Sequence, residues 1–366
     1  MYTESIKHRL IVLAYSEENG MSKALKHVLR ALVAVAVFGV HVAAYAQADD
    51  CKHRGQLDTL FCDENNDLVA DTPKDPKRWK NPGTLVFTYT PVEDAAVYET
   101  AFKPFLEYLG KCTAKRVVYF PVQSNAAEIE AMRAGRLHVG GFSTGPTGFA
   151  VNLAGAVPFA VKGNEKELQG YRLIVIVKKS SPYQKLADLR GKKVAHTSPS
   201  SNSGHLAPQV LFPPEGLVPD KDYKVLFSGG HGQSVNGVGS GDYDAAPVAS
   251  DVFTRMASRG DIKLDDFRTI YSSAPFPTSS FAYAHDLHPD LVKTLTKCFF
   301  DYRFPPEMQK SFGGADRFFP ITYQKDWAVV RKVNEESGTP FNRAAFEKQS
   351  ASEEAARKKA AAEKKK

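Results

Sequence analysis

The fold is decided by three short apolar runs, TLVFTY (residues 84–89), RVVYFPV (116–122) and LHVGGF (137–142). Each is rich in β-branched and aromatic residues and ends near turn-forming residues, which is the pattern of a buried strand. The segments between them, 96–110 and 125–134, carry apolar residues every three or four positions and are predicted to be amphipathic helices. Strands that alternate with helices of this length indicate βαβ units on a parallel sheet.

The same alternation recurs towards the C-terminus. Further strands are predicted at 171–178, 193–197, 223–227, 243–250 and 268–272, and further helices at 204–212, 289–302 and 325–336. These elements are too many for one small sheet, and a chain of 366 residues is long enough for about two domains. The sequence therefore predicts an α/β protein with two lobes.

The net charge of the chain is concentrated at its ends. Of the formal +7, residues 1–46 carry +2 and residues 351–366 carry +3, which leaves +2 for the body. A body so close to neutral lacks the basic surface that a nucleic-acid-binding protein needs. We therefore expect no nucleic-acid partner, and we expect residues 346–366, rich in Ala, Glu and Lys, to be a disordered tail.

The N-terminal region has the parts of a secretory signal peptide. Three basic residues between positions 23 and 30 precede an apolar run at 31–40, and Ala44-Tyr45-Ala46 follows as a cleavage pattern. The run is shorter than the roughly 20 residues of a membrane-spanning helix, so an anchor is the weaker alternative. Residues 1–46 are predicted to be an extension and signal peptide cleaved near Ala46, which places the mature protein in the periplasm.

A polar segment at 47–82 separates this leader from the first strand. Cys51 and Cys62 lie close together in it, and a local bridge is plausible because exported proteins can form disulfides. Cys112 and Cys298 could pair with each other, or each could be a buried free thiol.

Within this segment, oxygen-bearing side chains alternate at Asp63, Asn65, Asp67 and Asp71. Calcium loops use such alternating oxygen ligands. However, Leu68 stands where an EF-hand loop has its glycine, and no Glu follows at position 12. The two alternatives are a structural calcium site and a solvated acidic turn; no other cofactor is expected.

The most distinctive local feature is the hydroxyl-rich run 197–204, between a predicted strand and a predicted helix. The start of a helix presents free backbone N–H groups and a positive dipole end, so it can bind an anion without a basic side chain. Ser201, Asn202 and Ser203 would add side-chain donors, and Gly204 would let the backbone approach closely. Helix capping by Ser and Asn is the alternative.

Four other positions follow predicted strands. Ser143 and Thr144 come after the third strand, Glu93 after the first, and His231 lies in a glycine-rich turn. In open α/β sheets, ligands bind outside the carboxyl ends of the strands. No Gly-x-Ser-x-Gly, His-Glu-x-x-His or Gly-x-x-x-x-Gly-Lys-Ser/Thr motif occurs, so a hydrolase or nucleotide-binding enzyme is not expected.

These motifs together resemble those of the phosphate/phosphite/phosphonate-binding proteins of ABC importers, the PhnD-like family. The resemblance covers roughly residues 84–338. It is carried by Pro91-x-Glu93-Asp94, Glu130-Ala131-Met132-x-x-Gly135-Arg136-Leu137-His138, the junction after Gly141-Phe142, Asp188-Leu189-x-Gly191-Lys192-Lys193-Val194, and Ser200-Ser201-Asn202-Ser203-Gly204.

The resemblance implies a two-lobed type II periplasmic-binding-protein fold with hinge strands and a central cleft. We expect residues 83–178 and 281–345 to form one lobe and 179–280 the other, with hinges near 177–181 and 273–280. It also implies that an oxyanion binds to the Ser201–Gly204 helix start and His231, with Asp251 as an acidic site residue and Tyr98 on the wall of the first lobe.

The implied function is capture of a small oxyanion, a phosphonate, phosphite or phosphate, by a monomer that delivers it to an ABC permease in the inner membrane. The alternative is a sensor module for a membrane histidine kinase that responds to phosphite or arsenite. Neither role is enzymatic.

Overall fold

The computed structural model describes residues 51–93, 95–166 and 168–363, and the predicted signal peptide lies outside them. All elements named below belong to one compact unit, residues 52–366. Among the described residues, no helix combines the length and the apolar character that crossing a membrane requires.

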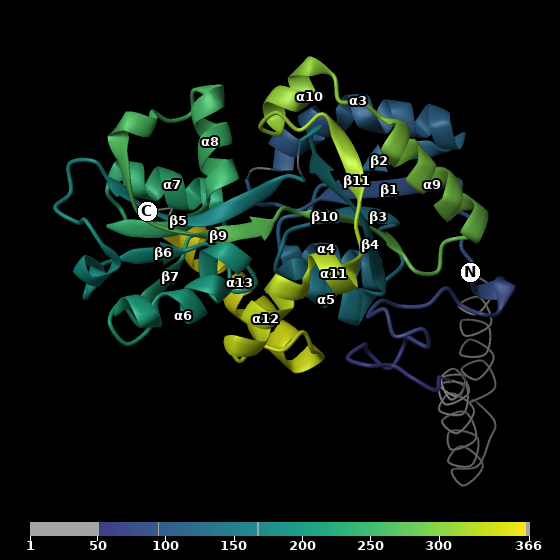
Figure 1. Ribbon diagram of the computed structural model, residues 1–366, viewed down its shortest axis with the longest axis horizontal. Helices are drawn as coiled ribbons and strands as arrows, with labels where there is room; N and C mark the ends of the chain where they lie inside the picture. Colours follow the sequence, from purple (N-terminus) through teal and green to yellow (C-terminus); the bar gives the residue numbers. More distant parts are fainter. Residues whose placement is uncertain (1–50, 94, 167, 364–366) are drawn as a thin grey trace, which may run out of the picture. The chain divides into compact units, whose positions relative to one another are not determined.

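A mixed six-stranded sheet forms the centre of the first lobe, in the order β11-β4-β10-β3-β1-β2 (Figure 1). β1 pairs in parallel with β2 and β3, as the alternating pattern predicted, whereas β10 and β11 run antiparallel to their neighbours. The strands are β1 (Thr84–Tyr89), β2 (Arg116–Tyr119), β3 (Val139–Phe142), β4 (Ala156–Gly163), β10 (Ser280–Ala284) and β11 (Arg317–Pro320).

A five-stranded sheet forms the second lobe, in the order β7-β6-β8-β5-β9. β6 is parallel to β7 and β8, and β5 is antiparallel to β8 and β9. The strands are β5 (Gly170–Lys178), β6 (Val194–His196), β7 (Val225–Phe227), β8 (Ala245–Ala249) and β9 (Phe267–Pro277).

The chain passes between the two sheets at two places next to each other. The first connection is 164–169, between β4 and β5, and the second is 278–279, between β9 and β10. The expected boundary at residue 178 is wrong, because β5 pairs along its length with strands of the second sheet. The sequence pattern of a fully buried strand does not depend on which sheet the strand joins. Periodicity therefore could not show that β5 belongs to the second sheet and that the chain crosses between the sheets before it.

Helices cover both faces of each sheet (Figure 1). α3, α9 and α10 lie on one face of the first sheet and α4 and α5 on the other; α7 and α8 lie on one face of the second sheet and α6 on the other. The helices are α3 (Ala95–Thr113), α4 (Asn125–Arg133), α5 (Pro146–Ala154), α6 (Ala207–Leu211), α7 (His231–Ser240), α8 (Ser250–Arg259), α9 (Pro289–Asp301), α10 (Pro306–Ser311), α11 (Tyr323–Asp326), α12 (Ala328–Glu336) and α13 (Arg343–Glu363).

Five shorter helical turns also occur within the described residues. Four are 3-10 turns, and the fifth, η3, is a π-helix that continues directly into α6. They are η1 (Pro76–Arg78), η2 (Leu186–Leu189), η3 (Asn202–Leu206), η4 (Pro213–Glu215) and η5 (Leu264–Asp266).

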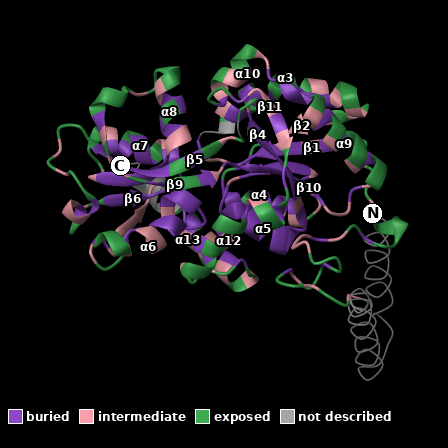
Figure 2. Cartoon of the chain, in the orientation of Figure 1, coloured by how far each residue is buried: buried purple, intermediate pink, exposed green. Residues whose placement is uncertain are grey.

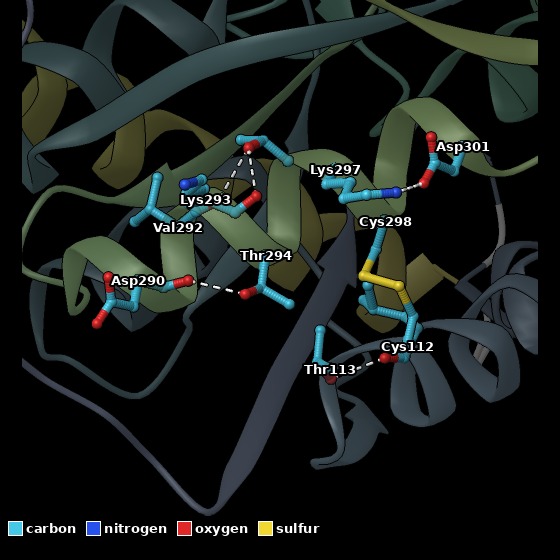
Figure 3. Close-up of a disulfide and its surroundings, with 11 residues drawn as sticks. Cys112, Thr113, Asp290, Val292, Lys293, Thr294, Lys297, Cys298 and Asp301 are labelled. Carbon is cyan, nitrogen blue, oxygen red and sulfur yellow. Dashed lines mark hydrogen bonds and ion pairs between the residues drawn. A yellow bond between two sulfur atoms is a disulfide. The ribbon is translucent and has the colours of Figure 1, made fainter.

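A disulfide joins Cys112, at the end of α3, to Cys298 in α9 (Figure 3). This decides between the two alternatives for these cysteines in favour of pairing. The bridge links positions 186 residues apart and so restricts the unfolded chain strongly. Cys51 and Cys62 are also disulfide-bonded, and none of the described cysteines is free.

The inner strands of both sheets are buried between helices, most of which expose their outer faces (Figure 2), whereas the edge strands β2, β7, β9 and β11 are partly exposed. Aromatic side chains fill much of the first lobe: the rings of Phe87, Phe102, Phe105 and Phe281 are each fully buried. The ring centroids of Phe102 and Phe281 are 5.9 Å apart and the rings meet edge to face, an arrangement that aromatic pairs favour. This core holds the strand ends that form the site.

The C-terminal segment is helical, contrary to the disordered tail expected for 346–366. α13 begins at Arg343, and Phe346 packs against Phe149 of α5 with ring centroids 5.8 Å apart. Phe341, just before the helix, also contacts Phe149, at 5.0 Å. The composition of 346–366 suggested a disordered tail because the buried aromatic residues lie only at the start of α13. Their packing against α5 stabilises the whole helix.

Candidate functional site

A small cavity lies where elements of the two sheets meet. Its volume is about 40 Å³; one water needs about 10–15 Å³ by the same measure, so the cavity admits a ligand of only a few non-hydrogen atoms. Of the predicted site residues, seven line it: Ser143, Thr144, Ser201, Asn202, Ser203, His231 and Asp251.

The helix that starts at Asn202 points its N-terminus into the cavity. Ser201 is the N-cap, and its hydroxyl accepts the N–H of Gly204 at 3.1 Å. Gly204 does not line the cavity but lies directly behind it, where any Cβ would collide with the side chain of Thr197. A glycine is therefore needed here for packing against Thr197, and the predicted close approach of its backbone to a ligand stays a prediction.

Two polar atoms of the cavity wall are buried and lack a hydrogen-bond partner among the described residues. They are the Thr197 hydroxyl and the side-chain oxygen of Asn202. The Asn202 amide nitrogen donates to the Tyr171 hydroxyl at 3.0 Å, which fixes the orientation of its oxygen. Buried polar groups are nearly always hydrogen-bonded, so this pair points to a polar ligand that both accepts and donates hydrogen bonds.

His231 presents a donor to the same cavity. The backbone N–H of Ala249 donates to its Nδ1 at 3.2 Å, which leaves the proton of the neutral ring on Nε2. Nε2 is 3.5 Å from the Ser201 hydroxyl. Burial lowers the pKa of His231 to about 4, so at neutral pH the ring is an uncharged donor.

An arginine that sequence reasoning missed also lines the cavity. Arg255 donates to Asp251 at 2.6 Å and to Glu93 at 3.0 Å. Nearby Asp251 and Glu93 hold the pKa of Arg255 well above its usual value, although burial opposes them. The sequence predicted a site that needs no basic side chain. The structure places Arg255 in the cavity wall, where it is already paired with two carboxylates.

Glu93 and Tyr98 do not line the cavity. The Tyr98 hydroxyl donates to Glu93 at 2.9 Å, and Glu93 also pairs with Arg259. The expectation that Tyr98 forms part of the cavity wall is therefore not met, since its hydroxyl is turned towards Glu93. Both residues instead support Arg255 from behind, and Asp94 lies outside the described residues.

The first lobe reaches the second through several polar contacts at this site. The Asn125 amide donates to the Ser200 hydroxyl at 3.1 Å, and the N–H of His231 donates to the carbonyl of Val92 at 3.2 Å. A Cβ on Gly145 would collide with the carbonyl oxygen of Ser200, so a glycine is needed for this approach. The two lobes are in contact around the cavity.

Nine further residues with polar side chains line the cavity and were not among the predicted site residues. They are Tyr89, Asn125, Tyr171, Thr197, Ser198, Arg255, Thr278, Ser279 and Glu353. Two signals were available: Tyr89 and Asn125 stand at a strand end and a helix start, and Arg255 is four residues after Asp251, at helix-pair spacing. Nothing in the local sequence indicated Glu353, which reaches the cavity from α13.

The acidic loop at 63–71 satisfies its own carboxylates. Asp63 accepts the backbone N–H of Asp67 at 2.9 Å and of Leu68 at 3.1 Å, and Asp71 accepts that of Glu64 at 2.7 Å. Asn65 donates to Asp67 at 3.0 Å. In the described part of the chain, no group of three or more His, Cys, Asp or Glu residues could hold a metal ion.

Comparison with known proteins assigns the chain to a family. The family model for periplasmic phosphonate-binding proteins of ABC transporters matches residues 87–327. The phosphate-import protein PhnD of Mycolicibacterium smegmatis is 27% identical over 277 residues, covering 71% of this chain and 85% of that protein. The phosphonates-binding periplasmic protein of Escherichia coli is 24% identical over 208 residues, 56% of this chain and 62% of that one.

Two solved structures share the fold. One is PhnD1 of Prochlorococcus marinus in complex with methylphosphonate, with a TM-score of 0.63 and 19% identity, covering 70% of this chain and 99% of that one. The other is a binding protein component of an ABC phosphonate transporter of Pseudomonas aeruginosa, with a TM-score of 0.63 and 20% identity, covering 77% and 99%. The predicted two-lobed fold and family resemblance are both confirmed: the chain belongs to the periplasmic substrate-binding proteins of phosphonate ABC transporters.

Proposed function

We propose that this protein captures a small tetrahedral oxyanion, a phosphonate, phosphite or phosphate, in the cavity at Ser201–Ser203, and delivers it to a membrane permease. Family membership supplies the general role of an extracytoplasmic binding protein with a small-molecule ligand and a permease partner; its relatives are binding proteins, not enzymes. The ligand class and the binding residues are our proposal.

The observation that carries the proposal is the helix start at Ser201–Gly204, where Ser201, Asn202 and Ser203 line a cavity of about 40 Å³ with hydroxyl and amide groups. Helix N-termini stabilise anions through backbone donors and the helix dipole. The volume excludes a large ligand, and the neutral Nε2–H of His231 adds a further donor.

The relatives support a phosphorus oxyanion rather than another anion. One relative is named for phosphate import, and one structural neighbour was solved with methylphosphonate. The unpartnered oxygen of Asn202 would accept a hydrogen bond from a ligand that carries a proton, as a singly protonated phosphonate or phosphate does. The comparisons lend no support to the alternative of a histidine-kinase sensor.

We further propose that the two lobes close over the ligand by a hinge motion at 164–169 and 278–279. These are the two connections between the sheets, and hinge closure around a ligand is a common motion of two-lobed proteins. Closure would exclude water and so strengthen each hydrogen bond to the anion.

Calorimetry on the purified protein tests the ligand class. We expect nanomolar-to-micromolar binding, about −8 to −12 kcal/mol, for at least one of methylphosphonate, 2-aminoethylphosphonate, phosphite and phosphate, with sulfate as the comparison anion. Absence of both heat and thermal stabilisation with all four phosphorus compounds would refute the proposal.

Ser203→Ala tests the site itself. Ser203 is 1% exposed and lines the cavity, so loss of a hydroxyl that bonds a charged ligand should weaken binding by about 1–3 kcal/mol. Ser258→Ala, on the exposed side of α8, is the matched control and should bind as the wild type does. Equal affinities of the two variants would remove Ser203 from the site.

A further inference from the structure

A fully buried lysine lies behind the cavity. Lys162, in β4, is 1% exposed, and its ammonium donates to the Tyr89 hydroxyl at 2.8 Å. It lies over three aromatic rings, with the nitrogen 4.8 Å from the centroid of Tyr89, 5.0 Å from Phe312 and 5.3 Å from Phe281. The sequence offered no sign of this, because one lysine in an apolar strand is usually taken as an exposed edge residue.

Lys162 differs from the other cation of the site in having no carboxylate partner. Arg255 forms ion pairs with both Asp251 and Glu93, whereas no ion pair with Lys162 occurs in the described part of the chain. A buried charge without a directly paired counterion is costly, and the cation–π contacts and the nearby Asp251 return only part of that cost. A residue kept in so unfavourable a position calls for a compensating anion.

The Tyr89 hydroxyl connects Lys162 to the cavity. Tyr89 lines the cavity together with Ser279, and its oxygen is the atom that accepts from Lys162. Because that oxygen is already an acceptor of the ammonium proton, the hydroxyl proton of Tyr89 is directed elsewhere. The ammonium is therefore separated from the cavity by one hydroxyl group.

Lys162 is surrounded by groups from three parts of the fold, two of which carry charged or titratable side chains. Asp251 and Arg255 face it from α8, and Glu93 and Tyr98 lie beyond Tyr89, whose ring is 4.6 Å from that of Tyr98. β10 and the segment after α10 contribute the uncharged rings of Phe281 and Phe312. Burial, and secondarily Arg255, lower the pKa of Lys162 to about 7, while Asp251 opposes this shift.

We propose that Lys162 is a positioning residue that supplies positive charge to the bound oxyanion through the Tyr89 hydroxyl, so that oxyanion binding takes up a proton at mildly alkaline pH. The proposal rests on the function proposed above. It is distinct from the helix-start donors, since it concerns a residue that does not touch the ligand.

The direction of the pH effect follows from linkage. Below pH 7 the ammonium is charged with or without ligand, so Lys162 adds affinity and takes up no proton. An anion near Tyr89 raises the pKa of Lys162, so between pH 7 and that raised value binding protonates the amine. At still higher pH the amine is neutral in both states and its contribution to affinity is lost.

The test is Lys162→Met, which keeps the length of the side chain and removes its charge. Calorimetry with methylphosphonate, in two buffers of different ionisation enthalpy at pH 6.5 and 8.5, measures affinity and proton uptake. We expect the variant to bind at least about tenfold more weakly at pH 6.5, the equivalent of one pKa unit. At pH 8.5 the wild type should take up more protons per ligand than the variant, and the ligand's own protonation cancels in this difference.

Stability separates this role from a structural one. Since the replacement removes an uncompensated buried charge, ligand-free Lys162→Met should melt at the same or a higher temperature than the wild type while binding worse. Lys178→Met, on an exposed lysine at the end of β5, is the control and should change neither quantity. If the Met variant does not fold, Tyr89→Phe, which keeps the lysine but removes the connecting hydroxyl, should show the same loss of proton uptake.

Two results would overturn the inference while leaving the proposed function intact. One is a Lys162→Met variant that binds methylphosphonate as tightly as the wild type does and takes up the same number of protons per ligand. The other is independent, additive effects of Lys162→Met and Tyr89→Phe in the double variant, since a residue acting through Tyr89 must give non-additive effects. Failure of the wild type to bind any phosphorus oxyanion would instead refute the proposed function itself.

Discussion

At the scale of single residues, two histidines lie directly behind the helix start. His196 of β6 and His205 of η3 share a hydrogen bond, with their Nδ1 atoms 2.8 Å apart, and Nε2 of His196 is 2.7 Å from the Tyr223 hydroxyl. Such a pair can share one proton but cannot accept a second without repulsion. Burial lowers the pKa of His205 to about 4 and holds that of His196 well below its usual range.

These shifts predict loss of stability in acid. The folded-state pKa of His205 lies below the unfolded value of about 6.5, so the unfolded chain takes up its proton first, and stability present above pH 6.5 is lost as the pH falls towards 4. At pH 5 this amounts to about 1–2 kcal/mol for one such group.

We therefore expect His205→Gln, which keeps a side-chain donor and acceptor, to lose less stability than the wild type between pH 7 and pH 5. Urea unfolding at both pH values measures the difference. An equal loss in both proteins would show that His205 does not contribute to acid unfolding.

At the scale of elements, α13 adds a feature that the family match, which ends at residue 327, does not include. Its first turn is fixed to the first lobe: Arg343 pairs with Glu130 at 3.4 Å and with Asp58 at 3.2 Å. Two turns further along, Glu353 is buried and lines the cavity. The helix thus brings a carboxylate to a site that we propose binds an anion.

Glu353→Gln should accordingly increase the affinity for a doubly charged oxyanion. A carboxylate in the cavity wall repels a negatively charged ligand, and at an effective dielectric constant of about 20 this repulsion is on the order of 1 kcal/mol or more. Calorimetry with methylphosphonate at pH 8.5 checks this, and Glu354→Gln, on the exposed neighbour, controls for the general charge of the helix. Weaker binding by the Glu353 variant would mean that the carboxylate accepts a proton from the ligand instead of repelling it.

At the scale of the whole lobed unit, ion pairs between α8 and the segment before α3 hold the lobes together. Glu93 of the first lobe pairs with Arg255 at 3.0 Å and also with Arg259, and it is 6% exposed. Removing one member of a buried ion pair is strongly destabilising, because it leaves a charge without compensation. The arrangement with the lobes in contact depends on this carboxylate.

We predict that Glu93→Gln weakens oxyanion binding by about 1–3 kcal/mol, less than the full cost of a broken buried pair because Asp251 still neutralises Arg255. Small-angle scattering during a ligand titration would show compaction at higher ligand concentration than in the wild type. Glu99→Gln, exposed on α3, is the control. Compaction of Glu93→Gln at the wild-type ligand concentration would exclude the ion pairs as a source of closure.

Much of the fold was predictable because it is encoded locally. Apolar residues that repeat every two positions in strands, or about every 3.6 positions in helices, show which side of an element is buried. Apolar patterning of this kind predicted the strands at 84–89 and 171–178 to within a residue or two. The hydroxyl-rich run before Gly204 was recognisable for the same reason: capping and anion binding at a helix start depend on neighbours in the sequence.

The sequence by itself determined the alternation of strands and helices, the helix start at Ser201 and the family resemblance. Only the tertiary structure decided that β5 joins the second sheet, that Cys112 pairs with Cys298, and that Lys162 and Glu353 stand beside one cavity. Local patterns fix the burial of a residue but not its partner, and these partners are brought together by packing between segments separated by tens to hundreds of residues. Whether a buried charged side chain is stabilised, and whether it can bind a ligand, depends on the groups packed around it.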